Sequence, residues 1–122
     1  MDRTQFRQFV EEAVDSLPDT FMEQIDNLEI VIERRPSREE LIAGGVAPGS
    51  TLLGLYHGIP LTARGEYYNL ALPDKISIYQ EPIEAMCRDD AEVRYQVRKT
   101  VLHEIAHYFG IDDERLHELG MG

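Results

Sequence analysis

The sequence has very little cysteine. Cys87 is the only one among 122 residues, so the chain cannot form the internal disulfide framework that stabilises many small secreted domains. With no second thiol at a redox or metal-binding spacing, Cys87 is expected to be a small inert side chain. The segment Met1–Phe6 lacks the basic patch and apolar run of a secretory signal. Both observations favour a reducing, cytoplasmic location.

Long apolar runs and basic residues are scarce as well. No stretch approaches the roughly 18 to 20 apolar residues that a membrane helix requires, so we expect no membrane partner. The chain has 12 Lys and Arg against 23 Asp and Glu, and its formal net charge is -11. Because non-specific nucleic-acid binding depends on Lys and Arg that neutralise phosphates, we expect no nucleic-acid partner either. The simplest role of the acidity is solubility.

The length and hydrophobic content fit one compact domain. A chain of 122 residues with 43% hydrophobic residues can bury a modest core unaided, so we expect a single domain over residues 1–122. Apolar spacing divides its first part into helices and a strand. The predicted elements are a helix over 4–17 that Pro18 ends, a short helix after Asp19, a strand over 28–33, and a helix that Ser37 and Glu40 cap and that runs through Ala43.

The second part contains the remaining strands and one long helix. Residues 51–56 and 60–62 flank a turn at 57–59 and predict a hairpin. The segment Lys75–Gln80 alternates polar and apolar residues, and we expect a half-buried strand at the edge of the sheet. Asp89 or Asp90, supported by Glu92, caps a long helix that Gly110 ends. Its apolar stripe consists of Val93, Val97, Val101, Ile105 and Phe109. Helices with a sheet of three or four strands predict an α+β fold.

The end of this helix carries the pattern H-E-x-x-H-x-x-G-x-x-D. His103 and His107 are four residues apart, so both imidazoles lie on one helix face, about 6 Å apart along the axis. At that spacing both can reach one zinc ion at the usual distance of about 2.0 to 2.1 Å. Gly110 favours a left-handed turn that brings the chain back, and Asp113 stands where a third ligand is needed. The motif therefore predicts a zinc site.

Such a ligand set is typical of a catalytic zinc site. Two neutral imidazoles and one carboxylate leave a net charge of +1 and an open fourth position for water, whereas a structural site has four protein ligands. Glu104, beside the first histidine, is then placed to act as general base. The alternative for the histidines is a partly buried pair bonded to neighbours, and Asp113 could instead cap a short final helix.

Beyond the motif, four segments extend a resemblance to a known family. They are Leu53–Tyr56, Gly58–Thr62, Leu72–Ile76 and Asp113–Leu116. With the motif helix they resemble, in the same order, the small bacterial zincin-like metallopeptidases sometimes called minimal zincins, over roughly residues 20 to 120. The resemblance implies a single-domain zincin core with a small mixed sheet packed on the H-E-x-x-H helix. It also implies His103, His107 and Asp113 as metal ligands.

Two functions follow from this reading. The first is a zinc-dependent metallopeptidase that hydrolyses peptide bonds of a peptide or protein substrate, with Glu104 as general base. The alternative is a zinc-stabilised protein-binding or regulatory module with little or no turnover. The chain departs from metzincins because the position expected for the third ligand holds Asp113 instead of histidine, and Met121 is too close to the terminus to be counted as a methionine turn. A chain this short also predicts a shallow groove.

Several other residues are weaker candidates for a role in peptide hydrolysis. An extended substrate would add antiparallel to a sheet edge, for which Lys75–Gln80 is the candidate, although an ordinary edge strand fits that segment equally well. Zincins often require a donor for the oxyanion besides the metal. The phenols and imidazoles considered for this role are Tyr67, Tyr68, Tyr79, His57 and His117, with packing or surface roles as the favoured alternative.

Overall fold

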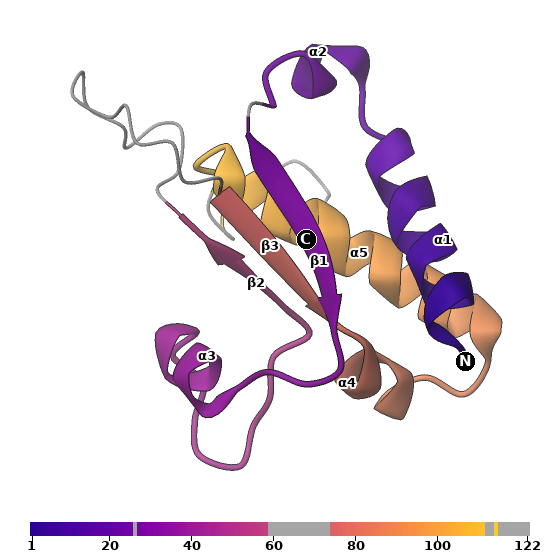
Figure 1. Cartoon of the computed structure of the whole chain (residues 1–122), viewed down its shortest axis with the longest axis vertical. Coiled ribbons are helices and arrows are strands. Elements are labelled where there is room, and N and C mark those ends of the chain that lie inside the picture. Colours follow the sequence, from indigo (N-terminus) through magenta and orange to yellow (C-terminus); the bar gives the residue numbers. More distant parts are fainter. Residues whose placement is uncertain (26, 59–73, 112–113, 115–122) are drawn as a thin grey trace.

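The structure is a computed structural model that describes residues 1–25, 27–58, 74–111 and 114. Its helices are α1 (Arg3–Asp15), α2 (Asp19–Met22), α3 (Arg38–Ala43), α4 (Gln80–Ala85) and α5 (Asp90–Tyr108), and its strands are β1 (Leu28–Glu33), β2 (Gly54–His57) and β3 (Asp74–Tyr79) (Figure 1). The strand order is β1-β3-β2, with β3 parallel to β1 and antiparallel to β2. The predicted α+β fold with a small mixed sheet is confirmed.

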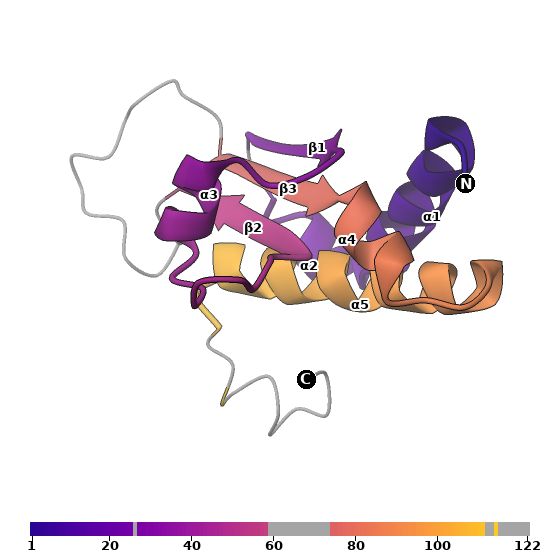
Figure 2. The ribbon, with the colours of Figure 1, turned by 90° about the horizontal axis from the view of Figure 1, so that it is seen from below.

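The hydrophobic core lies between the sheet and the helices α1 and α5. Figure 2 shows α5 running along one face of the sheet, while α3 lies at the opposite face. Ile76 and Ile78 of β3 are fully buried and share one core cluster with Val97 and Val101 of α5. Helix α1 packs along α5 and adds the buried ring of Phe6. Apolar packing therefore fixes α5 against the sheet.

Helix α5 begins and ends where the sequence predicts. The Asp89 carboxylate accepts a hydrogen bond from the Glu92 N–H at 2.9 Å, which is the expected N-cap. The apolar stripe is buried from Val93 onward, and its last member, Phe109, packs against the core while remaining partly exposed. Gly110 follows with a φ of 79°, the left-handed conformation that ends a helix at little cost for glycine.

The first part of the chain also folds largely as predicted. Strand β1 coincides with the expected range, and α1 lies within one or two residues of it. The capping box of α3 is complete: the Glu40 N–H donates to Ser37 Oγ at 3.1 Å, and the Ser37 N–H donates to Glu40 Oε1 at 2.9 Å. These elements depend on signals between near neighbours in the chain, which a sequence displays directly.

The prediction that Lys75–Gln80 forms an edge strand is wrong. Strand β3 pairs with β1 on one side and with β2 on the other, so it is the central strand. Its alternating polar residues suggested a solvent-facing side, but Ser77 and Tyr79 are both 0% exposed. They are buried on the second face of the sheet, where polar partners satisfy them. Gln80 belongs to α4, a helix that the sequence pattern did not reveal.

The predicted hairpin after β2 can be compared only in part. Strand β2 begins at Gly54, three residues later than expected, and pairs antiparallel with β3. The expected second arm at 60–62 lies outside the described residues, as do the candidate donors Tyr67 and Tyr68. The antiparallel neighbour of β2 in the described structure is therefore a strand further along the chain.

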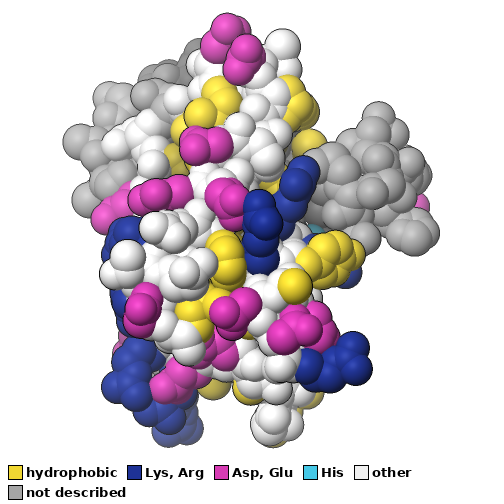
Figure 3. Space-filling model, turned by 90° about the vertical axis from the view of Figure 1, so that its right-hand side faces the viewer, with side chains coloured by type: hydrophobic (Ala, Val, Ile, Leu, Met, Phe, Trp, Pro, Cys, Tyr) yellow, Lys and Arg dark blue, Asp and Glu magenta, His cyan; other side chains and the backbone are white. Residues whose placement is uncertain are grey.

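The surface carries charges of both signs. On the face shown in Figure 3, acidic and basic side chains are interspersed and the hydrophobic ones form small separate groups. Arg94 of α5 donates to both carboxylate oxygens of Glu12 in α1, at 3.0 and 2.6 Å. Exposed pairs of this kind contribute about 0 to 1 kcal/mol, so packing dominates the α1–α5 contact. Within the described residues, no helix combines the length and apolarity needed to cross a membrane.

Candidate metal centre

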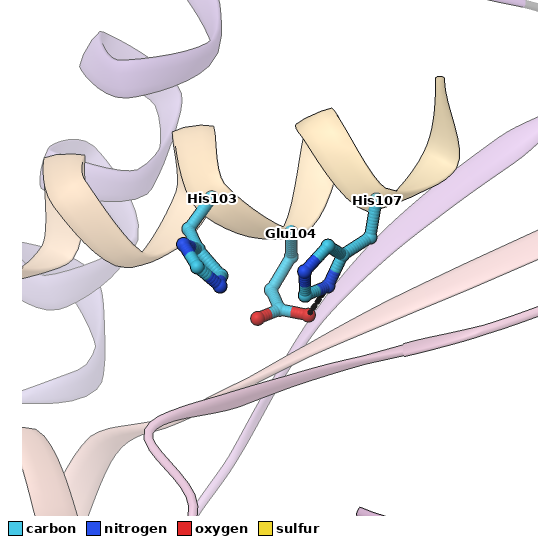
Figure 4. Close-up of side chains that lie close together, drawn as sticks. All are labelled: His103, Glu104 and His107. Carbon is cyan, nitrogen blue, oxygen red and sulfur yellow. Dashed lines mark hydrogen bonds and ion pairs between the residues drawn. The ribbon is translucent and has the colours of Figure 1, made fainter. Parts of the chain in front are cut away.

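Helix α5 brings together His103, Glu104 and His107. The possible ligand atoms of the three side chains all lie within 4.8 Å of one another. The two imidazole centroids are 4.6 Å apart, with 72° between the ring planes. Figure 4 shows all three side chains projecting from the same side of the helix, with the carboxylate between the rings. The one-turn spacing predicted from the sequence therefore produces a compact cluster.

The Glu104 carboxylate is the most buried member of the cluster. The residue is 7% exposed, whereas both histidines are partly exposed. Its Oε1 accepts a hydrogen bond from the backbone N–H of Tyr56 in β2 at 3.1 Å, and it lies 3.2 Å from His107 Nδ1. A buried carboxylate requires such partners, because desolvation without them is costly. The catalytic candidate is thus linked to both the helix and the sheet.

Gly54 allows β2 to approach α5 closely enough for that hydrogen bond. A Cβ atom at this position would lie 2.8 Å from Thr100 Cγ2 and 3.2 Å from Glu104 Cγ. Only a residue without a side chain fits between the strand and the helix at this distance. The sequence reading overlooked Gly54 and Tyr56 as parts of the site. The available signal was a glycine inside the apolar segment 52–55, which often marks close approach of another chain segment.

The cluster lies in a cleft of about 590 Å³ between α5, β2 and the end of α3. The lining residues are Gly44, Leu52, Gly54, Leu55, Tyr56, His103, Glu104, His107, Gly110 and Ile111. Among these described residues the only ionisable groups, apart from the Tyr56 phenol, are the two imidazoles and the carboxylate. A few convergent polar groups in a mostly apolar cleft are typical of a ligand-binding site.

The chain turns away from α5 immediately after the second histidine. The Gly110 N–H donates to the His107 carbonyl and the Ile111 N–H donates to the Ala106 carbonyl, both at 2.9 Å. Together with the positive φ of Gly110, these bonds end the helix and redirect the chain. Asp113 lies outside the described residues, and its role as third ligand stays a prediction. The same holds for the weaker candidate His117.

Tyr79 and His57 lie elsewhere. The fully buried Tyr79 donates its hydroxyl proton to Glu40 Oε2 at 2.6 Å, and it does not line the cleft. Burial, reinforced by the Glu40 carboxylate, raises the pKa of Tyr79, so the phenol remains a donor at neutral pH. His57 Nε2 lies 3.2 Å from Ser77 Oγ, in the same group of polar side chains as Tyr79 and Glu40. Both residues therefore contact Glu40 of α3, and neither lines the cleft.

The donor set of the cluster fits a zinc ion. Imidazole nitrogen and carboxylate oxygen are the usual zinc donors besides thiolate, and here they converge from one helix turn in a partly enclosed cleft. His107 Nδ1 lies 3.2 Å from Glu104 Oε1, the kind of contact that orients a ligating imidazole. His103 and His107 can therefore hold a metal ion, with the Glu104 carboxylate beside it.

A small mixed sheet packed on a helix with this His-Glu-His cluster is the arrangement of a zincin-type domain. The comparison with protein families agrees: the chain belongs to the zincin-like metallopeptidase family, whose model matches residues 25–122. A solved structure, described as a conserved hypothetical protein from Thermo thermophilus, covers 98% of this chain and 97% of its own, with a TM-score of 0.57 and 20% identity. That likeness shows the fold. None of the curated proteins matches the chain.

Proposed function

We propose that the protein is a zinc-dependent metallopeptidase in which His103 and His107 bind the metal, Asp113 completes the ligand set, and Glu104 is the general base. The observation that carries this proposal is the buried Glu104 carboxylate, which lies between two imidazoles in an otherwise apolar cleft. Because burying a carboxylate costs free energy, its place beside two imidazoles favours a chemical role over a purely structural one. Membership of the zincin-like metallopeptidase family supports the same reaction class.

The chain's own residues would then carry the proton transfers. A bound zinc ion would supply a Lewis acid for the peptide carbonyl and a water whose pKa is lowered to about 7. Glu104 would accept the proton of the attacking water and return it to the nitrogen of the leaving amine. The Tyr56 N–H, which donates to Glu104 Oε1, holds the carboxylate at the floor of the cleft. General acid–base catalysis of this kind contributes about 10² to 10⁴ in rate.

Among the described strands, β2 lies at the edge of the sheet beside the cluster and replaces Lys75–Gln80 as the candidate edge for an extended peptide. The Tyr79 N–H donates to the Leu53 carbonyl at 2.9 Å, so the alternation of an antiparallel ladder turns the main-chain groups of Gly54 and the Tyr56 carbonyl away from β3, while the Tyr56 N–H is already engaged by Glu104. Both residues line the cleft. A substrate paired antiparallel with this edge would pass beside the His-Glu-His cluster.

Zinc content and peptide hydrolysis, measured on the same preparations of wild type and Glu104→Gln, test the proposal. We expect one zinc ion per chain in both proteins, cleavage of a mixed fluorogenic peptide library by wild type, and a loss of at least about 10²-fold in the variant. Glu39→Gln, which removes an exposed carboxylate of α3, is the matched control and should behave like wild type. Equal, negligible rates in all three zinc-loaded proteins would instead identify a zinc-stabilised binding module.

A further inference from the structure

Helix α3 has no apolar anchor in the core. It is six residues long and none of them is buried; Ile42, its largest apolar residue beside Leu41, is 71% exposed. A helix of this length is not stable in water by itself, because nucleation is costly and the few hydrogen bonds gained do not offset it. With Leu41 only half-buried, polar contacts with the rest of the protein are expected to contribute much of what holds α3 in place.

Glu40 supplies these contacts from the middle of α3. Its Oε2 accepts the Tyr79 hydroxyl at 2.6 Å and lies 3.4 Å from His57 Nε2, while Oε1 accepts the Ser37 N–H at 2.9 Å. The side chain is 14% exposed. Burial would raise the pKa of Glu40, but the hydrogen bonds from Ser37 and Tyr79 outweigh it and lower the pKa to about 2. One ionised carboxylate thus links α3 to both β2 and β3.

The end of α3 forms one wall of the metal cleft. The Gly44 N–H donates to the Glu40 carbonyl at 2.8 Å, so the position of Gly44 follows that of Glu40 through one helical turn. Gly44 also contacts Leu52 closely, since a Cβ on Gly44 would lie 2.6 Å from Leu52 Cδ1. Gly44 and Leu52 line the same cleft as His103 and Glu104. We refer to Gly44 and Leu52 as the cleft wall.

We propose that Glu40 is a positioning residue: by linking α3 to the sheet it fixes the position of the cleft wall. The position of the wall then determines how well an apolar side chain of a ligand fits beside the metal. This inference rests on the proposed function, because the side chain belongs to a ligand that binds the metal. The wall offers no charge to such a ligand, and Leu52 offers an isobutyl group. The substrates favoured by this geometry have a medium-sized apolar residue next to the scissile bond.

Amide hydrogen exchange of the metal-free protein tests the link without zinc or turnover. Tyr79→Phe removes the hydroxyl donor of this link and Glu40→Ala removes its carboxylate acceptor. Glu39→Ala is the matched control in the same helix turn. Because a hydrogen bond to a charged group is lost, the Gly44 and Val46 amides should exchange about tenfold faster or more in the first two variants. Amides of α5 open only on global unfolding and should accelerate by no more than the loss of stability measured in denaturant, because no residue of α3 belongs to the core. Unchanged exchange at Gly44 in both Tyr79→Phe and Glu40→Ala would overturn the proposal.

Binding of two hydroxamates to the zinc-loaded protein tests the effect on the cleft. The pair is 4-methylpentanohydroxamate, which carries an isobutyl group, and acetohydroxamate, which does not; both chelate zinc through the two hydroxamate oxygens. We expect Tyr79→Phe and Glu40→Ala to weaken 4-methylpentanohydroxamate about fivefold, as partial loss of apolar burial predicts, and to leave acetohydroxamate unchanged. An equal change for both hydroxamates, or no change for either, would overturn the role of Glu40 in selecting the side chain.

The two tests separate this inference from the proposed function. If the wild-type protein binds no zinc, the proposed function fails, and hydrogen exchange alone decides whether Glu40 holds the cleft wall. If zinc binds and the hydroxamates discriminate as expected, but no peptide is cleaved, the wall stands as a determinant of ligand choice in a binding module. Faster exchange at Gly44 without any change in hydroxamate selectivity would leave Glu40 a structural residue and refute the selection step.

Discussion

Replacing Gly54 by alanine should destabilise the protein by forcing β2 away from α5. The added Cβ would lie 2.8 Å from Thr100 Cγ2, a distance that real Cβ atoms do not adopt, and 3.2 Å from both Glu104 Cγ and the Ser77 carbonyl oxygen. Thr100 is 6% exposed on a helix fixed in the core, so it cannot move aside freely. Overpacking of this kind costs about 1 to 3 kcal/mol, and we expect about 2 kcal/mol for three tight contacts.

A double-mutant cycle with Thr100→Ser tests this reasoning. Serine deletes the Cγ2 methyl that the new Cβ meets most closely, while it keeps the hydroxyl that accepts from Gln96 Nε2 at 3.2 Å. Urea unfolding of the four proteins gives the free energies. We expect Gly54→Ala to cost about 2 kcal/mol in wild type, with a fall in Tm of about 6 to 10 °C. In the Thr100→Ser background the cost should drop to about 1 kcal/mol, because the two contacts at 3.2 Å remain.

Two results would refute the close-packing argument. The first is a Gly54→Ala protein within about 0.5 kcal/mol of wild type, which is the range of ordinary surface substitutions. The second is the same cost of Gly54→Ala in both backgrounds, since independent effects simply add. Either result would mean that β2 does not depend on glycine to reach Glu104.

Three further predictions concern stability. Zinc at about 100 times its Kd should stabilise the wild-type protein by about 2.7 kcal/mol in thermal unfolding, a chelator should reverse this, and His103→Ala should abolish the zinc effect. Because hydrogen bonds outweigh burial and lower the pKa of Glu40 from 4.5 to about 2, its contribution to stability is present above pH 4.5 and is lost as the pH falls toward 2. Lowering the pH over that range should therefore reduce the free energy of unfolding of wild type by about 1 to 3 kcal/mol more than that of Glu40→Gln. Equal losses in the two proteins would contradict the lowered pKa of Glu40. Ile76→Ala, at a fully buried position, should cost about 2 to 5 kcal/mol in denaturant, whereas Ile42→Ala should stay within about 0.5 kcal/mol.

The motif helix could be predicted in detail because its signals are local. The cap at Asp89, the apolar stripe at every fourth position and the glycine at its end all operate within a few residues. Both histidines and Glu104 lie on that helix, so the cluster itself followed from spacing. The same is true of the capping box of Ser37 and Glu40, which is visible as a pair three residues apart.

The neighbours of the motif helix could not be predicted in the same way. The central position of β3 depends on pairing with segments about 20 and 50 residues away in the chain, and alternation alone does not reveal which strand lies between two others. The burial of Tyr79 depends on Glu40 from α3, a partner that no local pattern indicates. Likewise, the need for glycine at position 54 becomes visible only when Thr100 lies opposite it.

The most direct test of the proposed metallopeptidase site is anomalous scattering at the zinc absorption edge from crystals grown with zinc. The account predicts one strong peak in the cleft, at bonding distance of about 2.0 to 2.1 Å from a nitrogen of His103 and a nitrogen of His107, with an oxygen of Asp113 as third protein ligand. A crystal with the cleft free of anomalous signal, or with zinc held by other residues, would contradict it.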